Sequence, residues 1–145
     1  MKKPVVQKVV LGAVIFNQDN KILILQRNKD EDIYPNMWEL PSGKKEEFED
    51  VDKSLLREVK EETGLSGKIL MPFSVFNYKI EKPDEIRDST QINFLARAKS
   101  DKVNLSPEHQ NFAWIVSGQI NNYKISVQTK NVIRQAFKII RQFIV

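Results

Sequence analysis

Three glutamates close together in the chain have the residue type and spacing to bind a divalent cation. Glu58, Glu61 and Glu62 are separated by one to four positions. At about 100° per residue, these spacings place the three carboxylates on one side of a helix. They would lie near its C-terminus, where the helix dipole disfavours anions. Carboxylate oxygens are ligands of Mg²⁺ and Mn²⁺, so a bound cation would relieve the repulsion between the three negative charges.

The same spacing also fits a solvated acidic face, because Lys53, Arg57 and Lys60 lie nearby. Nine residues between positions 43 and 65 favour the metal site. They follow the pattern Gly-x5-Glu-x7-Arg-Glu-U-x-Glu-Glu-x-Gly-U, in which U is a bulky aliphatic residue. The matching residues are Gly43, Glu49, Arg57, Glu58, Val59, Glu61, Glu62, Gly64 and Leu65.

This segment resembles the Nudix box, so the chain is similar to the Nudix (MutT-like) hydrolases. A weaker resemblance extends over residues 25–27, 38–41 and 108–114. One departure is Ser42, because many family members have two glycines just before the box. The resemblance implies an α/β/α sandwich with a mixed β-sheet, in which the box forms a loop–helix–loop.

The resemblance also implies which residues bind the metal and carry the reaction. The expected ligands of Mg²⁺, or of Mn²⁺, are the backbone carbonyl of Gly43 and the carboxylates of Glu58, Glu61 and Glu62. Arg57 would orient a glutamate, and Glu49 would be its partner or an outer acid, since a guanidinium forks onto a carboxylate. The general base that takes a proton from water is Glu61, Glu62 or, from a later loop, Glu108.

Other residues have two interpretations each. Arg27, after the second expected strand, could bind a substrate phosphate or be a plain surface arginine. His109 could contact substrate or simply be exposed. Four aromatic residues could stack on a nucleobase or belong to the core, as strand aromatics usually do: Trp38, Phe76, Tyr78 and Phe94.

Apolar periodicity indicates the elements that must position these residues. Val51, Leu55, Leu56 and Val59 recur at helical spacing and predict a helix over residues 51–63 that faces a sheet. Asp50 or Asp52 could cap its start, and Gly64 fits a left-handed C-terminal cap. Strands are expected at 5–16, 21–26, 67–80, 90–99 and 112–116, a short extended piece at 38–41, and a closing amphipathic helix at 127–144. This order predicts one α/β (α+β) domain over residues 1–145.

Composition narrows the function classes. With no cysteine and one histidine, disulfides, thiolate nucleophiles and His-rich metal sites are excluded. No apolar run is long enough to span a membrane, and residues 1–12 fit a strand better than a signal peptide, so a cytoplasmic protein without a membrane partner is expected. Basic residues between 124 and 141 fit a solvated helix face; a nucleic-acid partner is not expected, and a homodimer is left open.

The predicted activity is Mg²⁺-dependent hydrolysis of a pyrophosphate bond in a nucleoside diphosphate linked to another moiety, with a nucleoside triphosphate as the favoured substrate. The alternatives are ADP-ribose or another nucleotide sugar, a dinucleoside polyphosphate, and a non-catalytic Nudix domain that only binds a nucleotide. All box carboxylates are present, which favours the enzyme over the silent domain.

Overall fold

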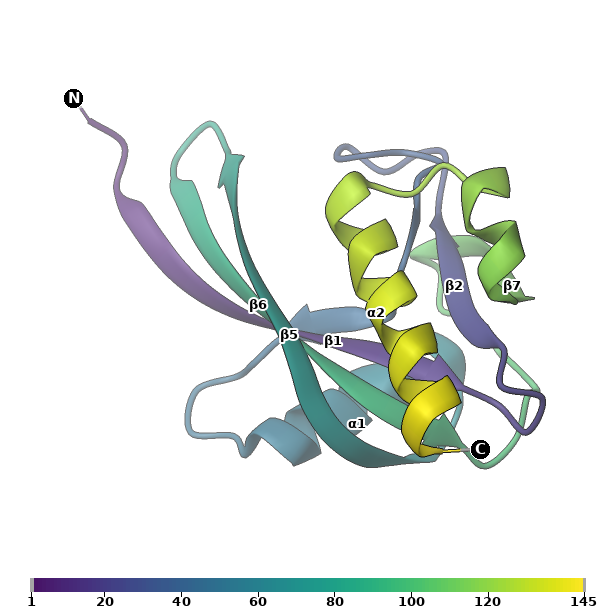
Figure 1. The fold of residues 1–145 in the computed structure, drawn as a ribbon. Coiled ribbons are helices and arrows are strands. Elements are labelled where there is room, and N and C mark those ends of the chain that lie inside the picture. The colour runs from purple at the N-terminus through teal and green to yellow at the C-terminus, as the bar shows by residue number, and fades with distance from the viewer. Residues whose placement is uncertain (1, 145) are drawn as a thin grey trace.

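A computed structural model describes residues 2–144, which form a seven-stranded mixed sheet with helices against it (Figure 1). The strands are β1 (Val5–Phe16), β2 (Ile22–Arg27), β3 (Trp38–Glu39), β4 (Ser42–Lys44), β5 (Gly67–Glu81), β6 (Ile86–Ala98) and β7 (His109–Ile115). The helices are α1 (Val51–Thr63), the 3₁₀ helix η1 (Ser117–Asn122) and α2 (Val127–Phe143).

The main path of the sheet runs β3-β2-β1-β6-β5, with β4 paired to β1 and β7 paired to β2. β1 and β6 are parallel over their shared length, from Val5 opposite Ile86 to Phe16 opposite Arg97. The other strand pairs are antiparallel. β1 therefore lies at the centre of the sheet and carries β4, the first strand of the Nudix-like segment, on one edge.

Side chains alternate between the two faces of β1, and each face has its own core. Ala13 packs on one face with Leu55 of α1. Val14 packs on the other face with Ile133 of α2. Because a helix covers each face of one mixed sheet, the expected α/β/α sandwich is confirmed.

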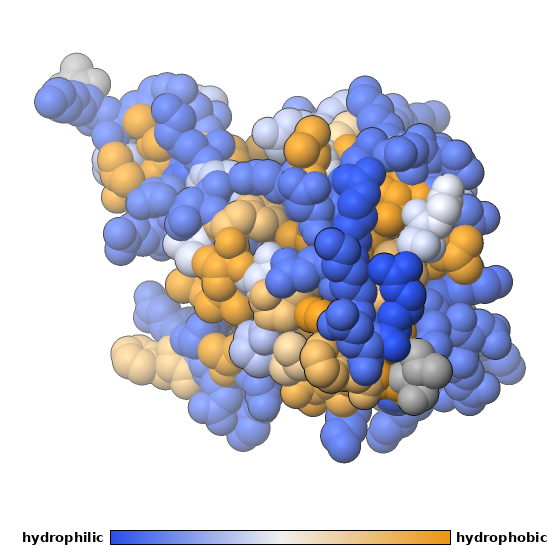
Figure 2. Space-filling model, viewed as in Figure 1, coloured by the Kyte–Doolittle hydropathy of each residue, from blue (hydrophilic) through white to orange (hydrophobic). Residues whose placement is uncertain are grey.

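The beginning of β1 and the β5–β6 hairpin extend beyond both helices as an arm (Figure 1). Figure 2 shows hydrophilic side chains along the outward side of α2, with apolar side chains gathered beside it. Apolar residues exposed on β5 include Met71 and Val75. No helix within residues 2–144 is long and apolar enough to cross a membrane.

Most expected elements are present, with several corrections. Gly64 is the left-handed C-cap of α1, with φ of 72°, and its N–H donates to the Lys60 carbonyl oxygen. Asp50 occupies the N-cap position, but its side chain makes no capping hydrogen bond. The prediction that Leu56 faces the sheet is wrong, because this side chain is exposed. β4 and η1 were not expected, and β7 begins three residues earlier than predicted, at His109.

Candidate functional site

Arg57 of α1 joins three of the expected site residues through its guanidinium group. Its Nε and Nη2 atoms each donate to one oxygen of Glu49, both at 3.0 Å. Its Nη1 atom donates to Glu58 at 2.9 Å and to Glu61 at 3.4 Å. The hydrogen bonds from Arg57 lower the pKa of Glu49 to about 2, and Glu49 is the main cause of a raised pKa for Arg57. Glu49 is thus held as an anion that fixes Arg57.

Gly43 lies directly against Glu58. A Cβ atom at position 43 would overlap the Glu58 carboxyl group, so glycine is needed for this close approach. Pairing with β1, where Leu11 is opposite Gly43, holds the Gly43 backbone in place. Burial raises the pKa of Glu58, against the opposing effect of Arg57. The β1–β4 pairing therefore presents the backbone of Gly43 to a half-buried carboxylate.

Glu62 is the most buried of the box acids, with 7% of its surface exposed. The backbone N–H of Ser42 donates to its Oε2 atom at 3.3 Å. Burial, followed by the charges of Glu39, Glu108 and Glu58, raises the pKa of Glu62 to about 9. A buried carboxylate surrounded by other carboxylates is costly unless a proton or a cation neutralises it.

Glu61 is the most open of the three acids, with a side chain 59% exposed. Between residues 2 and 144, no three acidic, histidine or cysteine side chains are grouped as ready ligands of one ion. Arg57 Nη1 instead donates to one oxygen of Glu58 and to one oxygen of Glu61. The donor set still fits a hard divalent cation, because it consists of crowded carboxylates beside a backbone that only glycine allows so close.

Glu39 of β3 links Arg27 and His109 beneath the site. The Nε2 atom of His109 lies 2.9 Å from the Oε2 atom of Glu39, and Arg27 Nη1 donates to the same oxygen at 3.3 Å. The expectation that His109 is exposed is wrong, because its side chain is 1% exposed. Arg27 is also no plain surface residue, because it bonds Glu31 and the Ile33 carbonyl as well. Sequence reasoning missed Glu39, although it lies in the recognised 38–41 segment.

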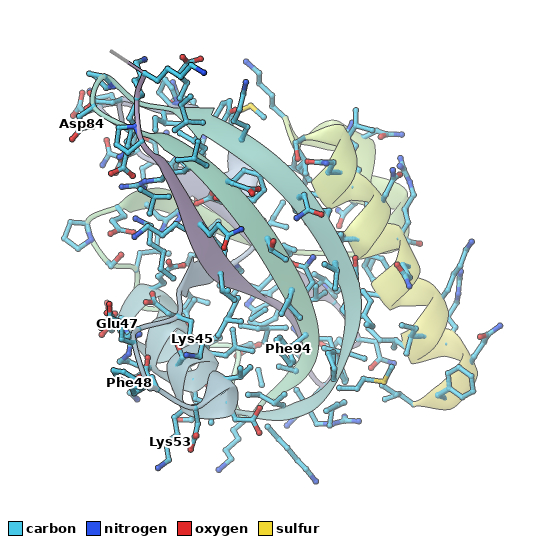
Figure 3. All side chains as sticks on the ribbon, turned by 90° about the vertical axis from the view of Figure 1, so that its left-hand side faces the viewer. Lys45, Glu47, Phe48, Lys53, Asp84 and Phe94 are labelled. Carbon is cyan, nitrogen blue, oxygen red and sulfur yellow. The ribbon has the colours of Figure 1, made fainter. Side chains whose placement is uncertain are left out.

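An aromatic cleft of about 250 Å³ opens next to the site. Trp38, Phe76 and Tyr78 line it together with Glu39 and Ser42. Its other lining residues come from loop 34–37, β6 and the start of α2: Tyr34, Met37, Gln91, Ser126, Gln128 and Thr129. Three of the four aromatic residues singled out in the sequence thus line one cavity. The fourth, Phe94, packs in the α1-side core, and Figure 3 places it on the sheet.

A second cleft of about 460 Å³ opens around Lys44, and it is called the cationic cleft after its three basic residues, Arg27, Lys44 and Lys82. The acids Glu31, Asp32 and Glu108 also line it, together with Ile33, so the formal charges of its lining balance. Burial lowers the pKa of Lys44, and the neighbouring cations Arg87, Lys8 and Lys82 lower it further. An anion bound beside Lys44 would offset the repulsion between Lys44 and these cations.

Gly43 lies between the two clefts. Ser42, its neighbour on β4, lines the aromatic cleft, and Lys44, its other neighbour, lines the cationic cleft. Glu58 lies against Gly43 itself. Figure 3 shows that the labelled tip of the following loop, Glu47 and Phe48, lies at the periphery of the molecule, and Phe48 is fully exposed. Gly43 thus lies between a cleft that contains aromatic side chains and a cleft lined by both basic and acidic ones.

Comparisons with known proteins agree with this architecture. The family model of the NUDIX domain matches residues 6–136. An RNA pyrophosphohydrolase from Sphingopyxis alaskensis is 28% identical over 125 residues, covering 75% of this chain and 77% of that protein. The nucleoside triphosphatase NudI of Escherichia coli is 24% identical over 140 residues, covering 88% and 95%.

The fold is also similar to the crystal structure of a MutT protein from Methanosarcina mazei, with a TM-score of 0.73 and 23% identity. That alignment covers 98% of this chain and 99% of the MutT chain. The family model covers most of the sequence, including the whole box and both helix-covered faces of the sheet. The chain therefore belongs to the Nudix family and is a hydrolase of pyrophosphate bonds.

Proposed function

We propose that this Nudix hydrolase cleaves a nucleoside triphosphate at a pyrophosphate bond in a reaction that depends on Mg²⁺. The observation that carries the proposal is the position of Gly43, with box carboxylates beside it and a different cleft on each side. An aromatic cleft suits a nucleoside, and a cationic cleft suits phosphates. A substrate that spans both would place its phosphate chain over the carboxylates.

The residues that would hold the cation are the Gly43 carbonyl, Glu58, Glu61 and Glu62. A bound divalent cation supplies charge neutralisation for the phosphates and makes a coordinated water more acidic. Arg57 would be a positioning residue, since its Glu49 fork and its Nη1 bond fix the Glu58 carboxylate. Buried Glu62 gains most from a cation, because its ionised form is unfavourable without one.

The proton acceptor is assigned to Glu61 or Glu62, with Glu108 as the alternative. Glu108 lines the cationic cleft, and its charge is felt by both Glu58 and Glu62. An inactive Glu108→Gln variant that still binds Mg²⁺ normally would favour Glu108 as the base. Full activity of that variant would leave Glu61 or Glu62 as the general base.

The cationic cleft supports a triphosphate over a nucleotide sugar. Arg27, Lys44 and Lys82 would face the phosphates beyond the bond that is cleaved, whereas a neutral sugar in this place would gain little from their positive charges. One of the two relatives, the nucleoside triphosphatase NudI, has a name that agrees with this substrate, whereas the other is named for RNA. Arg27 enters the proposal as a phosphate-binding residue that Glu39 and Glu31 orient.

A substrate panel tests the proposal. Nucleoside triphosphates, ADP-ribose and a dinucleoside tetraphosphate are compared by kcat/KM with Mg²⁺ and with EDTA. We expect triphosphate hydrolysis that needs Mg²⁺ and is abolished in the double variant Glu61→Gln, Glu62→Gln, while the exposed control Glu47→Gln retains it. A higher kcat/KM for ADP-ribose, or unchanged activity of the double variant, would overturn the proposal.

The cationic cleft has its own control. Lys82→Ala should raise KM for triphosphates about tenfold, a loss of roughly 1.4 kcal/mol, and should leave KM for ADP-ribose nearly unchanged. Lys68→Ala is the matched control, because Lys68 is an exposed lysine at the other end of β5 and lines neither cleft. Equal effects of Lys82→Ala on both substrates would show that the cleft does not select for phosphates.

A further inference from the structure

β6 carries a row of buried polar residues on the face that α2 covers. Ser89, Gln91 and Asn93 alternate along the strand and are 2%, 8% and 0% exposed. They continue the face on which Leu95 packs in the α2-side core. Burying an amide without full hydrogen bonding is unfavourable, so stability alone would favour apolar side chains here. Packing alone therefore does not account for three buried polar side chains on this face of β6.

Gln91 and Asn93 are fixed against each other. Gln91 Nε2 donates to Asn93 Oδ1 at 2.8 Å. The other end of the Asn93 amide, Nδ2, is buried and has no hydrogen-bond partner among residues 2–144. The side-chain carbonyl of Asn93 thus holds Gln91, while the amide nitrogen of Asn93 is left without a hydrogen bond in the described residues.

Gly12 of β1 makes the space for this pair. It lies opposite Asn93 in the parallel β1–β6 register. A Cβ atom at position 12 would overlap Asn93 Oδ1 and would come within 2.8 Å of Gln91 Nε2. The absence of a side chain at Gly12 therefore leaves room for the two amide groups beside the central strand.

Gln91 lines the aromatic cleft. Its Nε2 atom donates to Asn93, whereas within residues 2–144 no donor bonds its Oε1 atom, so Oε1 is available to accept a hydrogen bond from a molecule in the cleft. Glu39 lines the same cleft, and its Oε2 atom is already engaged by His109 and Arg27. Two acceptor groups, the Gln91 side-chain carbonyl and the Glu39 carboxylate, therefore belong to the lining of the cleft.

We propose that Gln91 determines base specificity by accepting a hydrogen bond from the amino group of a nucleobase, and that Asn93 is the residue that positions it. The inference rests on the proposed function, because it requires the nucleoside to lie in the aromatic cleft. Trp38, Phe76 and Tyr78 hold any base by its faces, so they discriminate little. An acceptor at the base edge rejects a base that offers a carbonyl there, because two acceptors would then face each other unpaired.

The test uses substrate pairs that differ mainly in the presence of an amino group: GTP with ITP, and CTP with UTP. We expect at least one pair in which the wild-type protein favours the amino-bearing member about tenfold or more in kcat/KM, chiefly through KM. Gln91→Met keeps the length of the side chain and removes the acceptor, so it should bring the two members of that pair within about twofold. Gln135→Met is the control, because Gln135 is an exposed glutamine of α2 outside the cleft.

Asn93→Leu tests the positioning role. It removes the bond to Gln91 together with an unpaired buried donor, so we expect equal or higher thermal stability but a weaker preference for the amino-bearing base, with kcat little changed. A stable Asn93→Leu variant that retains the full preference would refute the role of Asn93. If the wild-type protein hydrolyses triphosphates but treats both pairs alike, or if Gln91→Met keeps the preference, the inference is wrong. If no triphosphate is hydrolysed, the proposed function itself fails first.

Discussion

Replacing Glu62 by glutamine should stabilise the metal-free protein at neutral and alkaline pH. Glu62 is 7% exposed and lies close enough to Glu39, Glu58 and Glu108 for their charges to raise its pKa. Glutamine has nearly the same shape and can still accept a hydrogen bond from the Ser42 N–H. The substitution therefore removes the ionisable group without opening a cavity.

The magnitude follows from the difference in pKa between the two states. The pKa of Glu62 is 4.5 as the ordinary value and about 9 in the fold. Because the pKa of Glu62 is higher in the folded state, protonated Glu62 stabilises the fold. Its contribution to the free energy of unfolding is complete below about pH 4.5 and is lost as the pH rises toward about 9. At pH 7.5, three units at about 1.4 kcal/mol each give about 4 kcal/mol as an upper value, since relaxation and water entry reduce it.

The assay is urea unfolding in EDTA at several values between pH 5 and pH 8, followed by circular dichroism. The free energy of unfolding should fall with pH in the wild-type protein and in Glu47→Gln, whose position is exposed, and should be flatter in Glu62→Gln. Added Mg²⁺ should stabilise the wild-type protein at pH 8 more than the variant, because only the folded form presents the ligands. Parallel pH profiles of the wild-type protein and Glu62→Gln would refute the reasoning.

Four further substitutions test the site and the packing of α1. In Arg57→Lys, the lysine cannot make the paired hydrogen bonds of a guanidinium to a carboxylate, so kcat/KM should fall about 10–100-fold. Circular dichroism should show an unchanged fold, and normal activity would contradict the positioning role. Gly43→Ala pushes a methyl group into the Glu58 carboxyl, and a Mg²⁺ titration of activity should show at least roughly tenfold weaker binding; unaltered Mg²⁺ dependence would argue against Gly43 as a ligand. In thermal unfolding, Leu55→Ala should cost about 2–5 kcal/mol and exposed Leu56→Ala about 0.5 kcal/mol; equal losses would contradict the orientation of α1.

Local patterns predicted the elements that have strong periodicity. β1 and α1 have the predicted bounds, because β-branched residues dominate the first and apolar residues recur at helical spacing in the second. Gly64 ends α1 in the predicted left-handed conformation. The Arg57 fork onto Glu49 also has the geometry that the resemblance implied, although the roles of these residues remain predictions.

Features that depend on distant parts of the chain could not be predicted in this way. β4 is only three residues long and exists because β1 supplies its hydrogen bonds. His109 is buried with its Nε2 atom 2.9 Å from Glu39, which lies 70 positions earlier, and spacing within either segment gives no sign of this contact. Leu56 lies at the margin of the apolar arc of α1, where the fit to the sheet decides which residue is covered.

The parallel pairing of β1 with β6 has a kinetic consequence. Each pair in this register joins residues 81 positions apart, as Val5 and Ile86 are, so the whole Nudix box lies inside the loop that the pairing closes. Closing such a long loop reduces the entropy of the chain before the stabilising contacts have formed. We therefore expect folding to be slower than in a helical protein of similar size. β1 also aligns Gly43 with Glu58. We therefore expect a bound cation to lengthen the lifetime of the native state by slowing unfolding, with little effect on the rate of refolding.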